Sequence, residues 1–190
     1  MKTLFVLMSL AMAACGMADD VKPASDKYKD LPKKKQTTLG LYVTAKEAYE
    51  KWKADPEKVK IIDVRTPEEY LFVGHPTMAW KIPLVAQSYV WDAEKGQFPM
   101  TPLPGFVSRV RKIAQLEDTI LVTCRSGGRA AMAINALAQA GFTKVYNIVD
   151  GIEGDGNGDS DSTPKGGWKN SGCPWTKKLT PERMLLPDAG

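Results

Sequence analysis

The residues with the clearest capacity for chemistry form one short loop, Cys124-Arg125-Ser126-Gly127-Gly128-Arg129. The glycines allow the backbone to curl so that several N–H groups point to one centre and bind an anion. A helix that follows adds its positive N-terminal end, and Arg125 and Arg129 add formal charge. A buried cysteine with only a packing role does not need two arginines and two glycines beside it. We therefore expect Cys124 to be a nucleophile, largely in its thiolate form, with residues 125–129 binding an anionic substrate.

The loop interrupts an alternating pattern of strands and helices. Thr44 with Glu47 forms a capping-box pair, and Pro67 suits a first helical position, so both sites predict helix starts. The predicted strands are 59–64, 79–82, 119–123 and 144–149. The predicted helices follow Thr44 and Thr66 and cover 106–116 and 129–140. Residues 85–105 are rich in proline and aromatic residues and are expected to form a loop. Strands with unbroken apolar centres that alternate with helices predict an α/β fold, an open parallel sheet with helices on both faces.

Composition limits the chain to one compact domain. Its 190 residues include 43% apolar and 25% charged residues, which suits a packed domain and excludes a disordered chain. The net charge of +4 is too balanced to indicate nucleic-acid binding, and we expect none. Three cysteines exclude a disulfide-built scaffold, and a single histidine excludes a multi-histidine metal site. We expect neither a metal nor a cofactor.

The first residues have the layout of an export signal. Lys2 precedes an apolar run over residues 4–14, shorter than the ~20 residues that span a bilayer. Two interpretations stay open: cleavage ahead of Asp19, or a bacterial lipoprotein box in which Cys15 receives lipid and tethers the mature protein to a membrane. Either places the protein outside the cytoplasm, and we expect the periplasm. The predicted organisation is a signal over 1–18, a basic polar tether over 19–38, one domain over 39–180 and a tail over 181–190.

Several ordered motifs, together with the cysteine loop, resemble the rhodanese family of sulfurtransferases. The matching segments are 61–65 (IIDVR) with 68–70 (EEY), Gly74-His75 with 82–84 (IPL), and a closing segment of 145–151, 167–168 (GW) and 172–174 (GCP). The resemblance extends from about residue 42 to residue 175 and implies a single-domain, rhodanese-like α/β fold.

The resemblance implies a mechanism. The Cys124 thiolate would take the outer sulfur of thiosulfate or a similar donor as a persulfide and pass it to a thiophilic acceptor, cyanide or a thiol. Backbone amides of residues 125–129 would stabilise the anionic sulfur. Arg125 and Arg129 would attract the dianionic donor, while Ser126 would either donate a hydrogen bond or form the turn.

Loop length bears on the alternatives. Four residues separate Cys124 from Arg129, whereas the related phosphatases and arsenate reductases have five, which suits a tetrahedral oxyanion. The shorter loop favours sulfur transfer over these two activities. A further alternative is a persulfide carrier or sensing module, which turns over thiosulfate poorly and docks a partner protein through the aromatic, proline-rich segment 89–106.

Other residues that attract notice have structural explanations. Asp63 and Arg65 are expected to form an ion pair that braces nearby loops, and His75 to be a hydrogen-bonded turn residue. Cys173 either fills a small buried position or resolves a persulfide by disulfide exchange. The acidic segment 155–161 lacks the glycine and the final glutamate of a calcium-binding EF-hand, so we expect a mobile surface loop.

Overall fold

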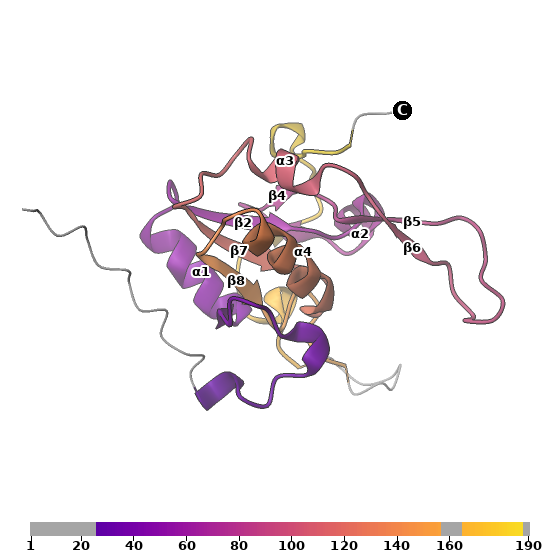
Figure 1. Cartoon of the computed structure of the whole chain (residues 1–190), viewed down its shortest axis with the longest axis horizontal. Coiled ribbons are helices and arrows are strands. Elements are labelled where there is room, and N and C mark those ends of the chain that lie inside the picture. Colours follow the sequence, from indigo (N-terminus) through magenta and orange to yellow (C-terminus); the bar gives the residue numbers. More distant parts are fainter. Residues whose placement is uncertain (1–25, 157–164, 188–190) are drawn as a thin grey trace, which may run out of the picture.

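A computed structural model describes residues 26–156 and 165–187 and centres on a five-stranded parallel sheet (Figure 1). The strand order is β1-β8-β7-β2-β4. These strands are β1 (Tyr42–Val43), β2 (Val59–Asp63), β4 (Trp80–Lys81), β7 (Thr119–Thr123) and β8 (Val145–Ile148). The α-helices are α1 (Ala45–Ala54), α2 (Pro67–Phe72), α3 (Phe106–Val110) and α4 (Gly128–Gln139). The predicted α/β class with an open parallel sheet is confirmed.

Helices cover both faces of the sheet because successive strand residues point in opposite directions. On β2, Ile62 packs into the cluster that α3 and α4 cover, and Ile61 packs into the cluster that α1 covers. Strand β7 divides in the same way, with Val122 on the first face and Leu121 on the second. Residues buried on both faces explain the unbroken apolar runs of the central strands.

Local signals place the helix starts as predicted. At α1 the Thr44 hydroxyl accepts a hydrogen bond from the Glu47 N–H (3.3 Å), and the Glu47 carboxylate accepts one from the Thr44 N–H (2.8 Å). Pro67 opens α2. Helix α4 ends at Gln139, and Gly141 two residues later has a φ of +97°, a conformation that glycine adopts at low cost.

The expectation of a loop over 85–105 is wrong. Strands β5 (Val85–Gln87) and β6 (Met100–Pro102) pair antiparallel and form an arm that extends away from the body of the molecule (Figure 1). The rings of Trp91 and Phe98 meet edge to face beyond the paired strands, with centroids 5.1 Å apart. Three-residue strands give too short an alternation to be recognised in sequence.

The predicted helix over 106–116 is also shorter than expected. Helix α3 ends at Val110, and the chain continues in tighter turns in which Lys112 and Ile113 donate to the carbonyls three residues before them. These turns keep Ala114 on the apolar stripe that suggested a longer helix.

Both predicted terminal segments pack against the domain where the structure describes them. Within the predicted tether lie two 3₁₀ turns, η1 (Asp26–Tyr28) and η2 (Lys33–Lys35), and η2 lies against α4. Within the predicted tail lies η4 (Pro181–Arg183), after which Leu185 donates its N–H to Lys81 at 2.9 Å. Specific polar contacts therefore hold residues 26–38 and 181–187 against the domain where the structure describes them.

The remaining short elements are β3 (His75–Pro76), which pairs with β9 (Trp175–Thr176), and η3 (Trp168–Asn170). The predicted signal over 1–18, with Cys15, lies outside the described residues, as does most of the acidic segment 155–161. Among the described helices, none has the length and apolar character needed to cross a bilayer.

Candidate active site

The cysteine loop lies at the carboxyl edge of the sheet. Strands β2 and β7 are parallel neighbours in a register that pairs Asp63 with Thr123. Chain segments that leave both strands therefore meet at one edge, where parallel sheets bind their ligands. Cys124 follows β7 directly and is only 2% exposed, so its sulfur lies at the floor of the site.

The loop curls around the sulfur as its glycines predict. The Gly127 N–H donates to the Cys124 sulfur, with nitrogen and sulfur 3.1 Å apart. Gly127 has a φ of +94°, and a Cβ atom there would lie 2.7 Å from the Val149 carbonyl oxygen. Both the conformation and the close approach require glycine at this position. The arrangement points a backbone dipole at the sulfur and stabilises negative charge on it.

The segment that follows β8 binds the backbone carbonyls of the cysteine loop. Ile152 donates its N–H to the Cys124 carbonyl at 2.9 Å, and Glu153 donates to the Arg125 carbonyl at 3.0 Å. Gly151 allows this approach, since a Cβ atom there would lie 2.5 Å from the Arg125 carbonyl oxygen. These bonds fix the outer side of the loop, whose Gly127 N–H donates to the sulfur.

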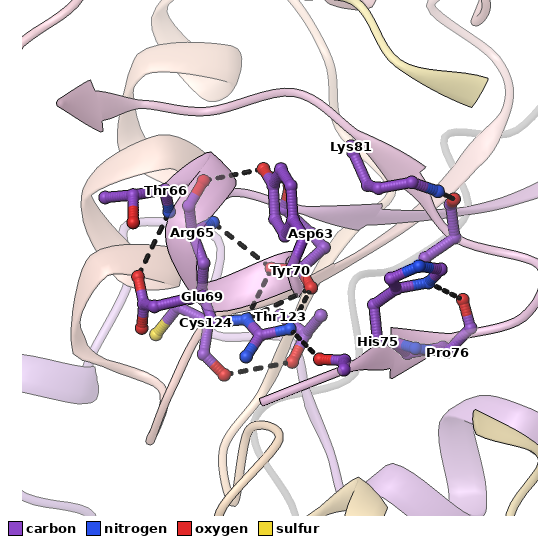
Figure 2. A network of polar contacts seen from close by, with 12 residues as sticks. Asp63, Arg65, Thr66, Glu69, Tyr70, His75, Pro76, Lys81, Thr123 and Cys124 are labelled. Carbon is purple, nitrogen blue, oxygen red and sulfur yellow. Dashed lines mark hydrogen bonds and ion pairs between the residues drawn. The ribbon is translucent and has the colours of Figure 1, made fainter. Parts of the chain in front are cut away.

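An open hollow of about 320 Å³ lies above the sulfur. Its lining combines five loop residues with one residue from α2 and one from the β5–β6 arm: Cys124, Arg125, Ser126, Gly128, Arg129, Glu69 and Met100. Figure 2 shows Glu69 beside Cys124 at this point. The structure thus brings together the residues of the loop predicted from sequence and adds two that sequence reasoning missed.

Glu69 changes the electrostatics of the hollow. Its two carboxylate oxygens each accept a hydrogen bond from the Arg129 guanidinium at 2.7 Å, and one of them also accepts from the Thr66 N–H at 3.0 Å. Burial raises the pKa of Glu69, but the contacts with Arg129 and Thr66 outweigh it and leave the pKa below its usual value. Arg129 is thus largely neutralised, whereas Arg125 is exposed. Glu69 lies three residues after Thr66 at a helix start, and this spacing predicts its contact with the Thr66 N–H. Nothing in the local sequence predicts its contact with Arg129.

Asp63 and Arg65 form the expected buried ion pair beneath the loop (Figure 2). Both side chains are 0% exposed, and the Arg65 guanidinium lies 2.6 Å from the Asp63 carboxylate. The same guanidinium donates to the Gly74 carbonyl at 2.6 Å, and the Tyr70 hydroxyl donates to the Arg65 carbonyl at 2.6 Å. The pair therefore braces the turn after β2 against the end of α2.

His75 and Cys173 lie away from the hollow. The Nδ1 atom of His75 is 3.0 Å from the Pro76 carbonyl oxygen, and burial lowers the pKa of this histidine. Cys173 packs in the cluster on the α1 face of the sheet, whereas Cys124 belongs to the cluster on the α4 face. The placement supports the prediction that Cys173 fills a small buried position.

Within the described residues there is no group of three or more His, Cys, Asp or Glu side chains that could hold a metal ion. Asp155, the first residue of the acidic segment, is instead bound to Lys35 at 2.6 Å.

Comparison with known proteins agrees with this geometry. The family model of the rhodanese-like domain matches residues 44–155. The senescence-associated protein DIN1 of Raphanus sativus is 37% identical over 92 residues, which are 48% of this chain and 45% of that protein. The chloroplastic thiosulfate sulfurtransferase 16 of Arabidopsis thaliana is 37% identical over 92 residues, which are 48% of this chain and 69% of that protein. The crystal structure of Rv0390 from M. tuberculosis matches with a TM-score of 0.54 and 26% identity, over 72% of this chain and 96% of that one.

The matched segment covers more than half of the chain, so the protein belongs to the rhodanese-like domain family. Membership of this family, with a relative named as a sulfurtransferase, supports sulfurtransferase activity. The chain spans less than half the length of the Raphanus protein, and thiosulfate appears in the name of the Arabidopsis relative.

Proposed function

We propose that the protein transfers a sulfane sulfur from thiosulfate or a similar donor to cyanide or a thiol through a persulfide on Cys124. In the first step the Cys124 thiolate attacks the outer sulfur of thiosulfate. A new S–S bond forms, and the old S–S bond breaks as sulfite leaves with the bonding pair. In the second step cyanide or a thiolate attacks the outer persulfide sulfur, and the Cys124 thiolate leaves with its bonding pair.

The observation that carries this proposal is the Gly127 N–H bond to the Cys124 sulfur at the floor of the open hollow. Backbone dipoles such as the Gly127 N–H stabilise negative charge on the sulfur, and a cysteine that reacts as its thiolate needs no general base. The same dipoles stabilise the negative charge that returns to the sulfur when the acceptor attacks. The one carboxylate among the hollow's lining residues, Glu69, is bound by Arg129 and is not arranged to take a proton from Cys124.

The charges around the hollow assign different roles to the two arginines. Arg129 forms an ion pair with Glu69 at 2.7 Å, which neutralises its charge and joins α4 to α2. Arg125 is exposed at the rim and is the cation available to a dianionic donor and to departing sulfite. Ser126 lines the hollow and supplies a hydroxyl donor there.

Incubation of the full-length protein with thiosulfate and cyanide tests the proposal. We expect thiocyanate to form, and Cys124→Ser to abolish it. Cys173→Ser, which removes the thiol on the other face of the sheet, is the matched control and keeps the activity. Absence of thiocyanate from the wild type, and of any added sulfur on Cys124 with other sulfane donors, would contradict the proposal.

A second candidate function is a persulfide carrier that delivers sulfur to a partner protein. It is favoured by the exposed side chains of the β5–β6 arm, of which Tyr89 and Trp91 are 84% and 55% exposed. Met100 of the same arm lines the hollow, so a partner seated on the arm would be beside Cys124. Rapid persulfide loading combined with negligible transfer to cyanide or small thiols would favour the carrier over the enzyme.

We also propose that the protein is exported to the periplasm, on the strength of the sequence of residues 1–18. The intact mass of the protein recovered from cells decides between cleavage ahead of Asp19 and lipidation at Cys15. Recovery of the uncleaved chain from the cytoplasmic fraction would contradict export.

A further inference from the structure

The last turn of the predicted tether, η2, packs against the segment that supports the Cys124 loop. The side chain of Lys35 is 3% exposed, which is rare for lysine unless its ammonium group is paired. Its Nζ atom donates to the Val149 carbonyl at 2.8 Å and contacts the two carboxylate oxygens of Asp155 at 2.6 and 2.7 Å. These contacts match the three N–H bonds that an ammonium group offers. The turn η2 is therefore docked through one inserted side chain.

The segment that Lys35 holds is the one that supports the cysteine loop. Val149 and Asp155 stand at its two ends, and between them Ile152 donates its N–H to the Cys124 carbonyl at 2.9 Å. The Val149 carbonyl oxygen also lies against Gly127, 2.7 Å from the position a Cβ atom would take. One ammonium group thus fastens both ends of the strap, residues 149–155, that supports the loop whose Gly127 N–H donates to the sulfur.

A buried amide makes a second link between the same two parts. Asn147 on β8 is 0% exposed, and its Nδ2 atom donates to the Lys35 carbonyl at 2.8 Å and to the Gly127 carbonyl at 3.1 Å. Farther along the chain the Thr38 N–H donates to the Asn135 side chain on α4 at 2.9 Å. The backbone around Lys35 is therefore fixed to the loop and to the helix that follows it.

We propose that Lys35 is a positioning residue for Cys124: by fastening the strap, it keeps the Gly127 N–H aimed at the sulfur. Lys35 lies outside residues 44–155, the segment that matches the family model. The predicted effect on turnover rests on the proposed function, whereas the predicted effect on thiol reactivity does not.

Loss of the contacts between Lys35 and the strap should affect the reaction differently from loss of a residue that contacts the substrate. Without the ammonium group the two ends of the strap separate, and the Gly127 N–H loses its alignment with the sulfur. This N–H stabilises the charge that returns to the Cys124 sulfur as the acceptor attacks, so its misalignment slows that step and lowers kcat more than it raises KM. The stabilisation of the Cys124 thiolate also falls, so its reaction with an alkylating agent slows.

Three variants of the full-length chain test the positioning role of Lys35. Lys35→Met removes the charge and keeps most of the side-chain length, Lys35→Arg restores a cation, and Lys33→Met removes an exposed lysine from the same turn. We expect Lys35→Met to lower kcat for transfer from thiosulfate to cyanide tenfold or more, with KM changed less than twofold. Alkylation of Cys124 by iodoacetamide at pH 7, followed by peptide mass, should slow at least fivefold. Lys35→Arg should recover most of both rates, and Lys33→Met should match the wild type.

A Lys35→Met protein with a lowered melting temperature but wild-type kcat and alkylation rate would overturn the proposal. If this variant does not fold, Asp155→Asn weakens the same contact at a carboxylate that is 61% exposed, and it should slow both rates at least twofold. Unchanged rates in Asp155→Asn would equally overturn it. If the wild type forms no persulfide at all, the proposed function fails, and the alkylation rates alone still decide the role of Lys35.

Discussion

The Arg129 guanidinium and the Glu69 carboxylate form a two-point ion pair, with both nitrogen–oxygen distances at 2.7 Å, at the rim of the hollow above Cys124. Their side chains are 16% and 18% exposed, so water weakens the pair only in part. The pair joins the start of α4 to α2 and removes one formal positive charge from the hollow. The site is thus less cationic than its sequence suggests.

Release of Arg129 from this pair should improve the binding of an anionic donor. We expect Glu69→Gln to lower the KM for thiosulfate about threefold or more, an effect of ~0.7 kcal/mol, which is the scale of a partly exposed ion pair. Steady-state transfer from thiosulfate to cyanide measures it, and Glu68→Gln, which removes the same charge one residue away, is the control. A KM that stays constant or rises in Glu69→Gln would contradict the assignment of Arg129 as a neutralised residue.

The same pair predicts how stability depends on pH. Because the folded pKa of Glu69 lies below its ordinary value of 4.5, the pair's contribution is fully present above that pH and is lost as the pH falls through the lower folded value. The free energy of unfolding of the wild type should therefore fall more steeply between about pH 5 and pH 3 than that of Glu69→Gln. Urea unfolding at a series of pH values measures both. Parallel curves for the two proteins would show that the pair contributes nothing.

The two adjacent glycines of the loop should respond differently to alanine. Gly127→Ala combines a φ of +94° with a Cβ atom 2.7 Å from a backbone oxygen, so we expect a loss of at least ~2 kcal/mol in the free energy of unfolding and impaired persulfide formation. At Gly128 the nearest atom to an added Cβ is 3.7 Å away, so Gly128→Ala should change stability by less than ~1 kcal/mol. Urea unfolding compares them, and equal stabilities would refute the described geometry.

Cys173 should be dispensable for sulfur transfer. It packs with Trp168 and Ile61 on the face of the sheet opposite to the cluster of Cys124. We expect Cys173→Ala to keep the transfer rate within about twofold and to lower the free energy of unfolding by ~1 kcal/mol, the typical cost of a small core truncation. Normal persulfide loading with abolished release would instead show that Cys173 resolves the persulfide.

Local signals were sufficient for much of the fold and for the sulfur's immediate surroundings. The pairing of Thr44 with Glu47 and the apolar run of residues 119–123 depend on neighbours within a few residues, which a sequence displays directly. The glycines after Cys124 likewise indicate a tightly curled loop, because glycine adopts backbone conformations that other residues avoid.

Contacts between distant residues could not be read from the same patterns. Lys35 lies in a run of lysines that indicates a solvated segment, and its contacts with Val149 and Asp155, 114 and 120 positions later, explain its burial. Glu69 and Arg129 are 60 positions apart, and the local sequence around either residue does not indicate that the two form a pair. The β5–β6 arm was missed because its strands are three residues long and are defined by pairing with each other.

The central claim, that sulfur travels on Cys124, is tested most directly by intact-mass and peptide-mass measurement of the full-length protein after brief exposure to thiosulfate. We predict the addition of one sulfur atom, located on Cys124, which disappears when cyanide is added and does not form in Cys124→Ser. An unchanged mass in the wild type, or a sulfur located on Cys173, would contradict the account.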